Sequence, residues 1–181
     1  MCSSDLQIRE KDLDTGSFAA EAARLKNLCA RFRVPYVVND SVEVALAIDA
    51  DGVHVGQSDI NGRDIRSLIG PDKILGISAG TVEEAIAAEN AGADYIGVGA
   101  VFGTSTKKNA RNLTVEKLKE ISSCVSIPVV AIGGINGKNL MELSGSGVDG
   151  VAVVSAIFAA EDPGKATAEL LALAKQMIAN G

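Results

Sequence analysis

The sequence has no tryptophan, and aromatic residues make up only 3% of its 181 residues. A stacking platform for single-stranded nucleic acid is therefore not expected, since such platforms depend on aromatic side chains. The 17 basic residues are outnumbered by 23 acidic ones, and the net charge of −6 argues against a broadly basic nucleic-acid surface. An anionic substrate would have to be held by a few local cations or by a metal ion.

The chain also lacks the marks of a secreted or membrane protein. Its three cysteines, Cys2, Cys29 and Cys124, have no metal-type spacing, and an odd number of scattered thiols is typical of a reducing cytosol. No apolar run reaches membrane-spanning length, and the N-terminus does not read as a signal peptide. We therefore expect a cytoplasmic protein that binds neither membranes nor nucleic acid.

What the sequence does contain is a short apolar run, rich in valine and isoleucine, that recurs between amphipathic stretches. Runs of this kind are typical of strands covered on both faces. The predicted strands cover residues 6–10, 34–39, 52–56, 74–78, 95–101, 128–134 and 150–156. The predicted helices cover residues 17–33, 81–91, 112–122, 137–146 and 164–180. Three short sequence segments resemble one another, and in each an acidic residue precedes a predicted strand. These acids are Asp51, Asp94 and Asp149.

Repeated βα units fit either an open doubly wound sheet or a closed (β/α)8 barrel, and the glycine placement favours the barrel. Glycine-rich turns follow the late strands, whereas no GxGxxG follows the first strand. We therefore predict a single α/β domain over residues 1–181, a (β/α)8 TIM barrel. Because only seven strands are found, we expect the first βα unit to be missing and residues 1–6 to be a non-native leader. A chain short of one unit is expected to be weakly stable or inactive.

Polar residues gather where several predicted strands end, which is where barrel enzymes place their catalytic groups. On the first strand, Gln7, Arg9 and Lys11 share one face and suggest an anion site, although a solvent-exposed strand would give the same alternation. Asn39 and Asp40 end the next strand, where they are either functional or a cap for the helix that follows.

Asp59 follows the third strand and adds a second carboxylate at the same end of the predicted barrel. With Asp40 it suits Mg²⁺, which takes one or two carboxylates and completes its shell with water and phosphate oxygens. Farther along the chain, Thr104, Thr106 and Lys107 offer hydroxyl and ammonium groups that could hold a phosphate. These residues predict a site for phosphorylated molecules.

The last strands end in residues that barrels often use for phosphate. Gly134 and Ser155 are the natural donors there, and a turn glycine or an N-cap serine would be compatible with that role. His54, the only histidine, lies in the middle of a predicted strand, where a hydrogen-bonded interior residue is favoured over a general base. Cys124 precedes a strand at the opposite end of the barrel, so no catalytic thiol is expected.

Five motifs together resemble the thiamine-phosphate synthase family, whose order they follow between residues 7 and 158. They are Gln-Ile-Arg-Glu-Lys, Val-Asn-Asp, Gly-Val-His-Val-Gly-Gln-Ser-Asp, Gly-Thr-Ser-Thr-Lys-Lys and Val-Ala-Ile-Gly-Gly-Ile. The resemblance implies a (β/α)8 barrel transferase of thiamine biosynthesis that uses Mg²⁺. It would join hydroxymethylpyrimidine diphosphate to thiazole phosphate, giving thiamine phosphate and pyrophosphate. Its partners would be these small phosphorylated molecules. The oligomeric state stays open, with a homo-oligomer as one alternative.

The resemblance also implies roles for individual residues. The pyrimidine diphosphate would contact Gln7, Arg9, Lys11, Asn39, Ser78 and Lys107. Of these, Arg9, Lys11 and Lys107 would act catalytically on the leaving diphosphate, and Asp40 and Asp59 would hold Mg²⁺. The thiazole phosphate would contact Thr104, Thr106, Gly134, Val154 and Ser155.

Three positions depart from the family pattern. Ser41 stands where the family commonly has arginine, and Gly80 and Gly103 replace a frequent histidine and proline. Two alternatives within the resemblance are a thiazole tautomerase-like relative and a non-catalytic binder of thiazole phosphate or thiamine phosphate. The retained cations and carboxylates speak against the tautomerase-like relative. A sugar-phosphate isomerase barrel would explain the late glycine turns but not the paired carboxylates.

Overall fold

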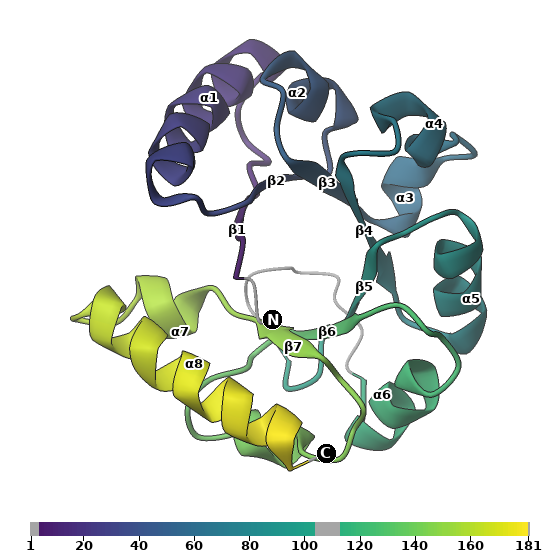
Figure 1. Cartoon of the computed structure of the whole chain (residues 1–181), viewed down its shortest axis with the longest axis vertical. Coiled ribbons are helices and arrows are strands. Elements are labelled where there is room, and N and C mark those ends of the chain that lie inside the picture. Colours follow the sequence, from purple (N-terminus) through teal and green to yellow (C-terminus); the bar gives the residue numbers. More distant parts are fainter. Residues whose placement is uncertain (1–3, 104–112, 181) are drawn as a thin grey trace. The chain divides into compact units, whose positions relative to one another are not determined.

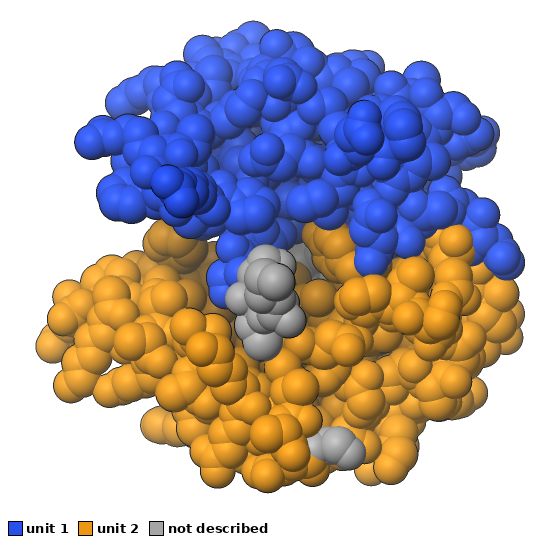
Figure 2. Space-filling view, in the orientation of Figure 1, with its two compact units in different colours: residues 1–78, 90–94 blue, residues 79–89, 95–181 orange. Residues whose placement is uncertain are grey.

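The structure is a computed structural model that describes residues 4–103 and 113–180. Within these residues the chain alternates strands and helices, as Figure 1 shows. It forms two compact units, unit 1 with residues 1–78 and 90–94 and unit 2 with residues 79–89 and 95–181 (Figure 2). None of the helices in the described part is long and apolar enough to cross a membrane.

Unit 1 contains parallel strands that pair in chain order. They are β1 (Leu6–Ile8), β2 (Tyr36–Asn39), β3 (Gly52–Val55) and β4 (Ile74–Ala79), the last residue of β4 being counted in unit 2. The helices of unit 1 are α1 (Thr15–Phe32), α2 (Val42–Ala47), α3 (Gln57–Ile60) and α4 (Ile65–Ile69). Every residue of β2 and β3 is buried, as expected for strands covered on both faces.

Unit 2 contains three further parallel strands, again paired in chain order. They are β5 (Tyr95–Gly99), β6 (Val129–Ile132) and β7 (Gly150–Ala152). Its helices are α5 (Val82–Asn90), whose last residue is counted in unit 1, α6 (Val115–Ser122), the 3₁₀ helix η1 (Leu140–Leu143), α7 (Ser155–Phe158) and α8 (Pro163–Ala179). The core of this unit includes Leu118 and Ile121 of α6, which are fully buried.

The seven predicted strands are all present among the described residues, and the alternation of parallel strands with helices confirms the α/β class. The helix predicted over residues 81–91 is confirmed as α5, and the Thr81 hydroxyl before it accepts the N–H of Glu84 at 3.2 Å. No bounds were predicted for the short helices α2, α3, α4 and α7, because few residues give no readable helical period. The prediction of a single domain stays a prediction.

The helix predicted over residues 137–146 is wrong, because only the 3₁₀ helix η1 forms there. Asn136 and Asn139 use their side chains to accept backbone N–H groups at the start of this segment, from Lys138 at 2.9 Å and Asn136 at 2.8 Å. Local bonds of this kind compete with helical ones. Gly145 and Gly147 then adopt positive φ angles of 73° and 78°, which stop any continuation.

The acids of the three similar sequence segments, Asp51, Asp94 and Asp149, share one structural role. Each carboxylate accepts a backbone N–H at the start of the preceding strand, at 2.7–2.8 Å: Asp51 from Tyr36, Asp94 from Leu75 and Asp149 from Val129. The carbonyl groups of the same three strand residues accept the acids' own N–H groups at 2.8–3.1 Å. The repeat therefore satisfies backbone groups at the amino ends of the strands.

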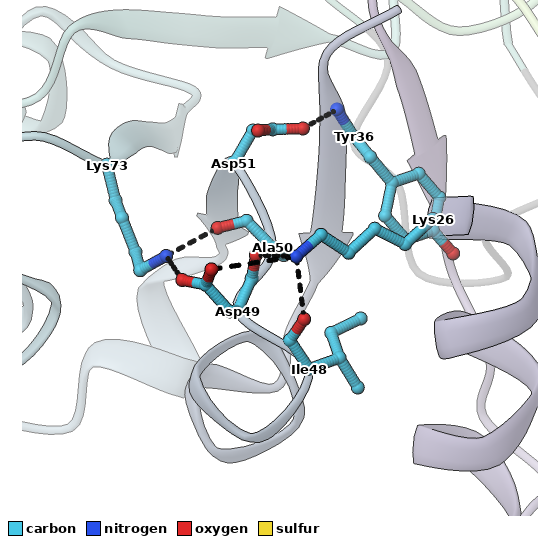
Figure 3. A network of polar contacts seen from close by, with 7 residues as sticks. All are labelled: Lys26, Tyr36, Ile48, Asp49, Ala50, Asp51 and Lys73. Atoms are coloured by element: carbon cyan, nitrogen blue, oxygen red, sulfur yellow. Dashed lines mark hydrogen bonds and ion pairs between the residues drawn. The ribbon is translucent and has the colours of Figure 1, made fainter. Parts of the chain in front are cut away.

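Two lysines hold the carboxyl end of α2 in unit 1 (Figure 3). Lys26 of α1 donates to the carbonyl groups of Ile48, at 2.9 Å, and of Asp49. Lys73 donates to the Asp49 carboxylate at 2.6 Å and to the Ala50 carbonyl at 2.7 Å. Cations at a helix carboxyl end are favourable because the last carbonyl groups carry partial negative charge. These contacts tie α1 and the start of β4 to α2.

Candidate functional site

The cationic residues of the first motif follow β1. The strand ends at Ile8, which pairs with Val38 one residue before the end of β2. Gln7 lies on the strand as predicted, whereas Arg9 and Lys11 lie in the segment after it. The prediction of one shared strand face is therefore wrong for Arg9 and Lys11, which follow the carboxyl end of β1.

Asn39 and Asp40 end β2, as the sequence predicted. Asn39 is its last residue and is buried. Asp40 has a φ of 67°, in the left-handed region that residues other than glycine rarely adopt and that is enriched at functional sites. Neither residue caps α2, because the N-cap is Ser41, whose hydroxyl accepts the Val44 N–H at 3.2 Å. The Asp40 carboxylate is thus left for other partners.

The Asp40 carboxylate contacts both a cation and a second carboxyl group of unit 1. It forms an ion pair with Lys11 and a hydrogen bond with Asp59. Asp59 lies on α3, and its Oδ2 accepts the Gly56 N–H at 2.8 Å, which fixes this carboxyl group at the start of the helix. The two acids predicted to hold a metal therefore lie together.

The pKa values of these two carboxyl groups shift in opposite directions. Burial raises the pKa of Asp59, and the charge of Asp40 adds to the rise, against a lowering by the Gly56 N–H. Burial also acts to raise the pKa of Asp40, but its contacts with Lys11 and Asp59 outweigh this. The charges of Lys11 and Arg9 lower the pKa of Asp40 further, below its ordinary value of 3.8. Asp40 is therefore the readily ionised member of the pair.

The donor set fits Mg²⁺ better than a transition metal. Asp40 and Asp59 offer hard carboxylate oxygens, and no cluster of three or more histidine, cysteine, aspartate or glutamate side chains suits a metal among residues 4–103 and 113–180. A closed zinc site would need about four nitrogen or sulfur ligands. Magnesium takes one or two carboxylates and keeps its other positions for water and phosphate oxygens.

Ser78 on β4 has two polar neighbours from the third motif. Nε2 of His54 lies 2.9 Å from the Ser78 hydroxyl oxygen, and the Gln57 side chain donates to the Ser78 carbonyl at 2.7 Å. His54 is only 8% exposed, which confirms the expected hydrogen-bonded interior histidine. The contact from Gln57 was not predicted, since only its place beside Asp59 in the motif could have drawn attention to it.

In unit 2, Gly134 forms the turn after β6 with a φ of 67°. A Cβ atom at this position would lie 2.1 Å from the Gly103 carbonyl oxygen, so that only glycine fits. The Gly134 carbonyl accepts hydrogen bonds from the side-chain amides of Asn136 and Asn139, both at 3.0 Å. This exposed turn is thus held in one conformation.

Val154 and Ser155 follow β7 and are exposed. The strand predicted over residues 150–156 ends at Ala152, and α7 begins at Ser155, so the predicted strand was too long. The N–H groups of Ile157 and Phe158 donate to the Val154 carbonyl at 3.0 Å, so the candidate donors to a phosphate at this turn are the N–H groups of Ser155 and Ala156. Thr104, Thr106 and Lys107 lie outside the described residues, and the predictions for them stay predictions.

Two clefts are lined by other residues. One, of about 590 Å³ in unit 1, lies beside Arg63, Ser67 and Gly92. The other, of about 810 Å³ in unit 2, lies beside Lys138 and Leu173. None of the predicted site residues that the structure describes lines either cleft, so these residues mark a candidate site at the carboxyl ends of the strands of each unit.

Solved structures with the same fold include proteins of high and low sequence identity. Thiamine phosphate pyrophosphorylase from Pyrococcus furiosus matches with a TM-score of 0.87 and 42% identity, covering 97% of this chain and 84% of that one. A 3-hexulose-6-phosphate synthase matches with a TM-score of 0.62 at 16% identity, which shows the fold alone. These matches confirm the predicted fold class of repeated βα units.

Sequence relatives name one family. A family model described as thiamine monophosphate synthase matches residues 4–157. The thiamine-phosphate synthase of Clostridium botulinum is 48% identical over 165 residues, which cover 91% of this chain and 78% of the relative. That of Methanobrevibacter smithii is 51% identical over 168 residues, covering 93% of this chain and 80% of the relative. The chain belongs to the thiamine monophosphate synthase family.

Proposed function

We propose that this chain joins hydroxymethylpyrimidine diphosphate to thiazole phosphate, giving thiamine phosphate and pyrophosphate. Membership of the family supports the reaction, and both substrates are small phosphorylated molecules. The reaction takes place in the cytoplasm, where the thiols of Cys29 and Cys124, which are free, would stay reduced.

One observation in unit 1 carries the proposal: Asp40 contacts Lys11 and Asp59 at the carboxyl ends of its strands. A diphosphate brings several negative charges to an acidic protein, and it needs local cations to offset them. Asp40 and Asp59 are the residues that would hold Mg²⁺, and Arg9 and Lys11 stand beside them. Bound there, the ion would neutralise phosphate oxygens and so favour departure of the diphosphate.

The chemistry needs no protein nucleophile. The bond between the methylene carbon and the diphosphate oxygen breaks, and pyrophosphate leaves with the electron pair. The electron-rich aminopyrimidine stabilises the resulting methylene cation, and the thiazole nitrogen then donates its electron pair to that carbon. Arg9, Lys11 and Lys107 stabilise the departing negative charge, which is an electrostatic form of catalysis. A chain with one histidine can therefore catalyse this reaction.

The remaining residues position the two substrates. Gln7 and Asn39 contact the pyrimidine diphosphate, and Ser78 contacts its pyrimidine ring. The thiazole phosphate is held by donors of the loops that follow late strands, as in many barrels. These donors are Thr104, Thr106, Gly134, Val154 and Ser155.

The test is release of pyrophosphate when both substrates and Mg²⁺ are mixed with the folded chain. Replacing Asp40 by alanine should lower the rate by roughly 100-fold or more, since even outer partners of metal ligands are worth 10- to 100-fold. Lys107→Ala should lower it as well. Asp72→Ala is the matched control, because this exposed acid precedes β4 at the amino end of the strand and should leave the rate unchanged.

The outcomes separate the alternatives. Pyrophosphate release that needs both substrates and Mg²⁺ supports the proposal. A folded chain that binds thiazole phosphate or thiamine phosphate without any release supports the non-catalytic binder instead. Conversion of the thiazole alone would support a tautomerase-like relative.

A further inference from the structure

His54 of β3 lies at the junction of several site groups. It is the only histidine of the chain, and its Nε2 lies 2.9 Å from the Ser78 hydroxyl oxygen on β4. Its backbone carbonyl accepts the N–H of Asp40 at 2.8 Å. This one buried residue thus contacts both Asp40, an acid proposed to hold Mg²⁺, and the serine proposed to contact the pyrimidine.

The surroundings fix the distance between His54 and Ser78. β3 and β4 are paired in register, with His54 opposite Gly76. On the other side of Ser78, the Gln57 side chain donates to its carbonyl at 2.7 Å. The Ser78 backbone is therefore held by both the sheet and α3, and the freedom that remains lies in the Ser78 side chain.

We infer that His54 is a positioning residue that fixes the Ser78 hydroxyl for its hydrogen bond to the pyrimidine ring. This inference rests on the proposed function. A hydroxyl group has one hydrogen to donate and two lone pairs to accept with, and alone it rotates among them. The contact with Nε2 commits either the hydrogen or one lone pair, so the remaining hydrogen-bonding capacity is directed before substrate arrives. Pre-orientation of this kind lowers the entropic cost of binding.

Three variants test the inference by calorimetry of pyrimidine diphosphate binding in the presence of Mg²⁺. His54→Leu keeps the bulk and removes the polar contact, and it should weaken binding roughly fivefold to tenfold, as expected for one hydrogen bond. His54→Gln places an amide nitrogen near the position of Nε2 and should recover most of the loss. With Ser78→Ala already present, His54→Leu should weaken binding no further, because the group it orients is gone.

Two controls separate positioning from a purely structural effect. Binding of Mg²⁺ alone and of thiazole phosphate alone should be unchanged in His54→Leu and His54→Gln, since the backbone carbonyl that holds Asp40 is retained. An equal loss of affinity for the pyrimidine diphosphate, for Mg²⁺ and for thiazole phosphate would overturn the inference. Additive losses of pyrimidine diphosphate binding in His54→Leu and Ser78→Ala would overturn it as well. If His54→Leu does not fold, His54→Ala, which also removes the polar contact, takes its place in the comparison with and without Ser78→Ala.

Failure of the inference is distinguishable from failure of the proposed function. A chain that releases pyrophosphate normally but shows additive losses refutes only the role of His54. A folded chain that neither binds the pyrimidine diphosphate nor releases pyrophosphate refutes both.

Discussion

The ammonium group of Lys11 forms an ion pair with the carboxylate of Asp40, a residue whose φ of 67° holds it in the left-handed region. Lys11 is about half exposed, with 49% of its side chain accessible, whereas the Asp40 side chain is only 22% accessible. Lys11 therefore contacts a carboxylate oxygen that we propose as a ligand of Mg²⁺. Binding of the ion and release of Lys11 toward the diphosphate are expected to be linked.

Substituting Lys11→Met should therefore affect metal and substrate in opposite directions. Loss of the competing ammonium group should tighten binding of Mg²⁺ in the absence of substrate, up to about fivefold for a partly exposed ion pair. Release of pyrophosphate should fall, because a cation proposed to contact the diphosphate is lost. Calorimetry with Mg²⁺ alone measures the first effect, and weaker Mg²⁺ binding in Lys11→Met would contradict it.

Neutralising either Asp40 or Asp59, the acids proposed to hold Mg²⁺, should remove most Mg²⁺ binding. We expect Asp40→Asn and Asp59→Asn each to weaken it by roughly 100-fold, at least the loss measured for outer partners of metal ligands. Asparagine keeps an oxygen that can accept the Gly56 N–H, so Asp59→Asn should fold normally. Binding of Mn²⁺ as a paramagnetic substitute provides the measurement, and full retention by either variant would refute its role as a ligand.

The acids that precede strands should act on stability rather than on chemistry. Asp149→Ala leaves the Val129 N–H without its 2.8 Å partner, which should lower the free energy of unfolding by about 1–3 kcal/mol. Asp149→Asn keeps an acceptor oxygen and should recover most of this loss. Urea unfolding of both variants gives the comparison, and equal losses in the two would show that charge, rather than the hydrogen bond, is responsible.

Tyr36 is fully buried, and its hydroxyl oxygen has no hydrogen-bond partner among the described residues. Burial raises the pKa of this hydroxyl group. Tyr36→Phe removes an unsatisfied polar atom, so the free energy of unfolding should stay constant or rise by up to about 1 kcal/mol. Tyr36→Ala should lower it by about 3–5 kcal/mol through the cavity that it leaves. A clear loss of stability in Tyr36→Phe would reveal a partner for the hydroxyl group.

Asp49 should contribute to stability in a pH-dependent way. The hydrogen bond and charge of Lys73, followed by the charge of Lys26, lower its pKa below the ordinary value of 3.8. The unfolded chain then binds a proton more readily than the folded one, so this contribution is present above pH 3.8 and disappears as the pH falls through the lower folded value.

Unfolding by urea at several pH values tests the role of Asp49. Asp49→Asn should be less stable than the unsubstituted chain near neutral pH, and the two should converge as the solution becomes more acidic than pH 3.8. Lys73→Met serves as the partner variant and should show the same convergence. A difference that does not change with pH would contradict the assignment to this ion pair.

Much of the fold could be predicted because burial on both faces leaves a strong local signal. β2 and β3 read as continuous apolar runs, and each was located within two residues of its observed bounds. α2 and α3 gave no such signal, since helices of six and four residues are too short to show a period. The 3₁₀ helix η1 was mistaken for a longer helix because apolar spacing does not report the competing bonds of Asn136 and Asn139.

Part of the candidate site could likewise be predicted from the sequence, and part of it could not. The closeness of Asp40 and Asp59 was predicted from their places after strands, because parallel strands bring their carboxyl ends to one edge. The ion pair of Asp40 with Lys11 and the contact of His54 with Ser78 were not predicted. The two residues of each pair lie 24 or more positions apart in the sequence, and their side-chain rotamers decide whether they touch.

By itself, the sequence determined the class of fold, the order of the strands and the residue types gathered at their ends, because hydrophobic period and turn chemistry are local properties. Only the tertiary structure decided which of these polar groups touch one another. It made Asp51, before β3, a partner of a backbone N–H and Asp40, after β2, a partner of Lys11, although the sequence shows each only as an acid next to a predicted strand. The physical reason is that hydrogen bonds and ion pairs act over about 3–4 Å, a precision that strand pairing and loop conformation supply and that no pattern along the chain encodes.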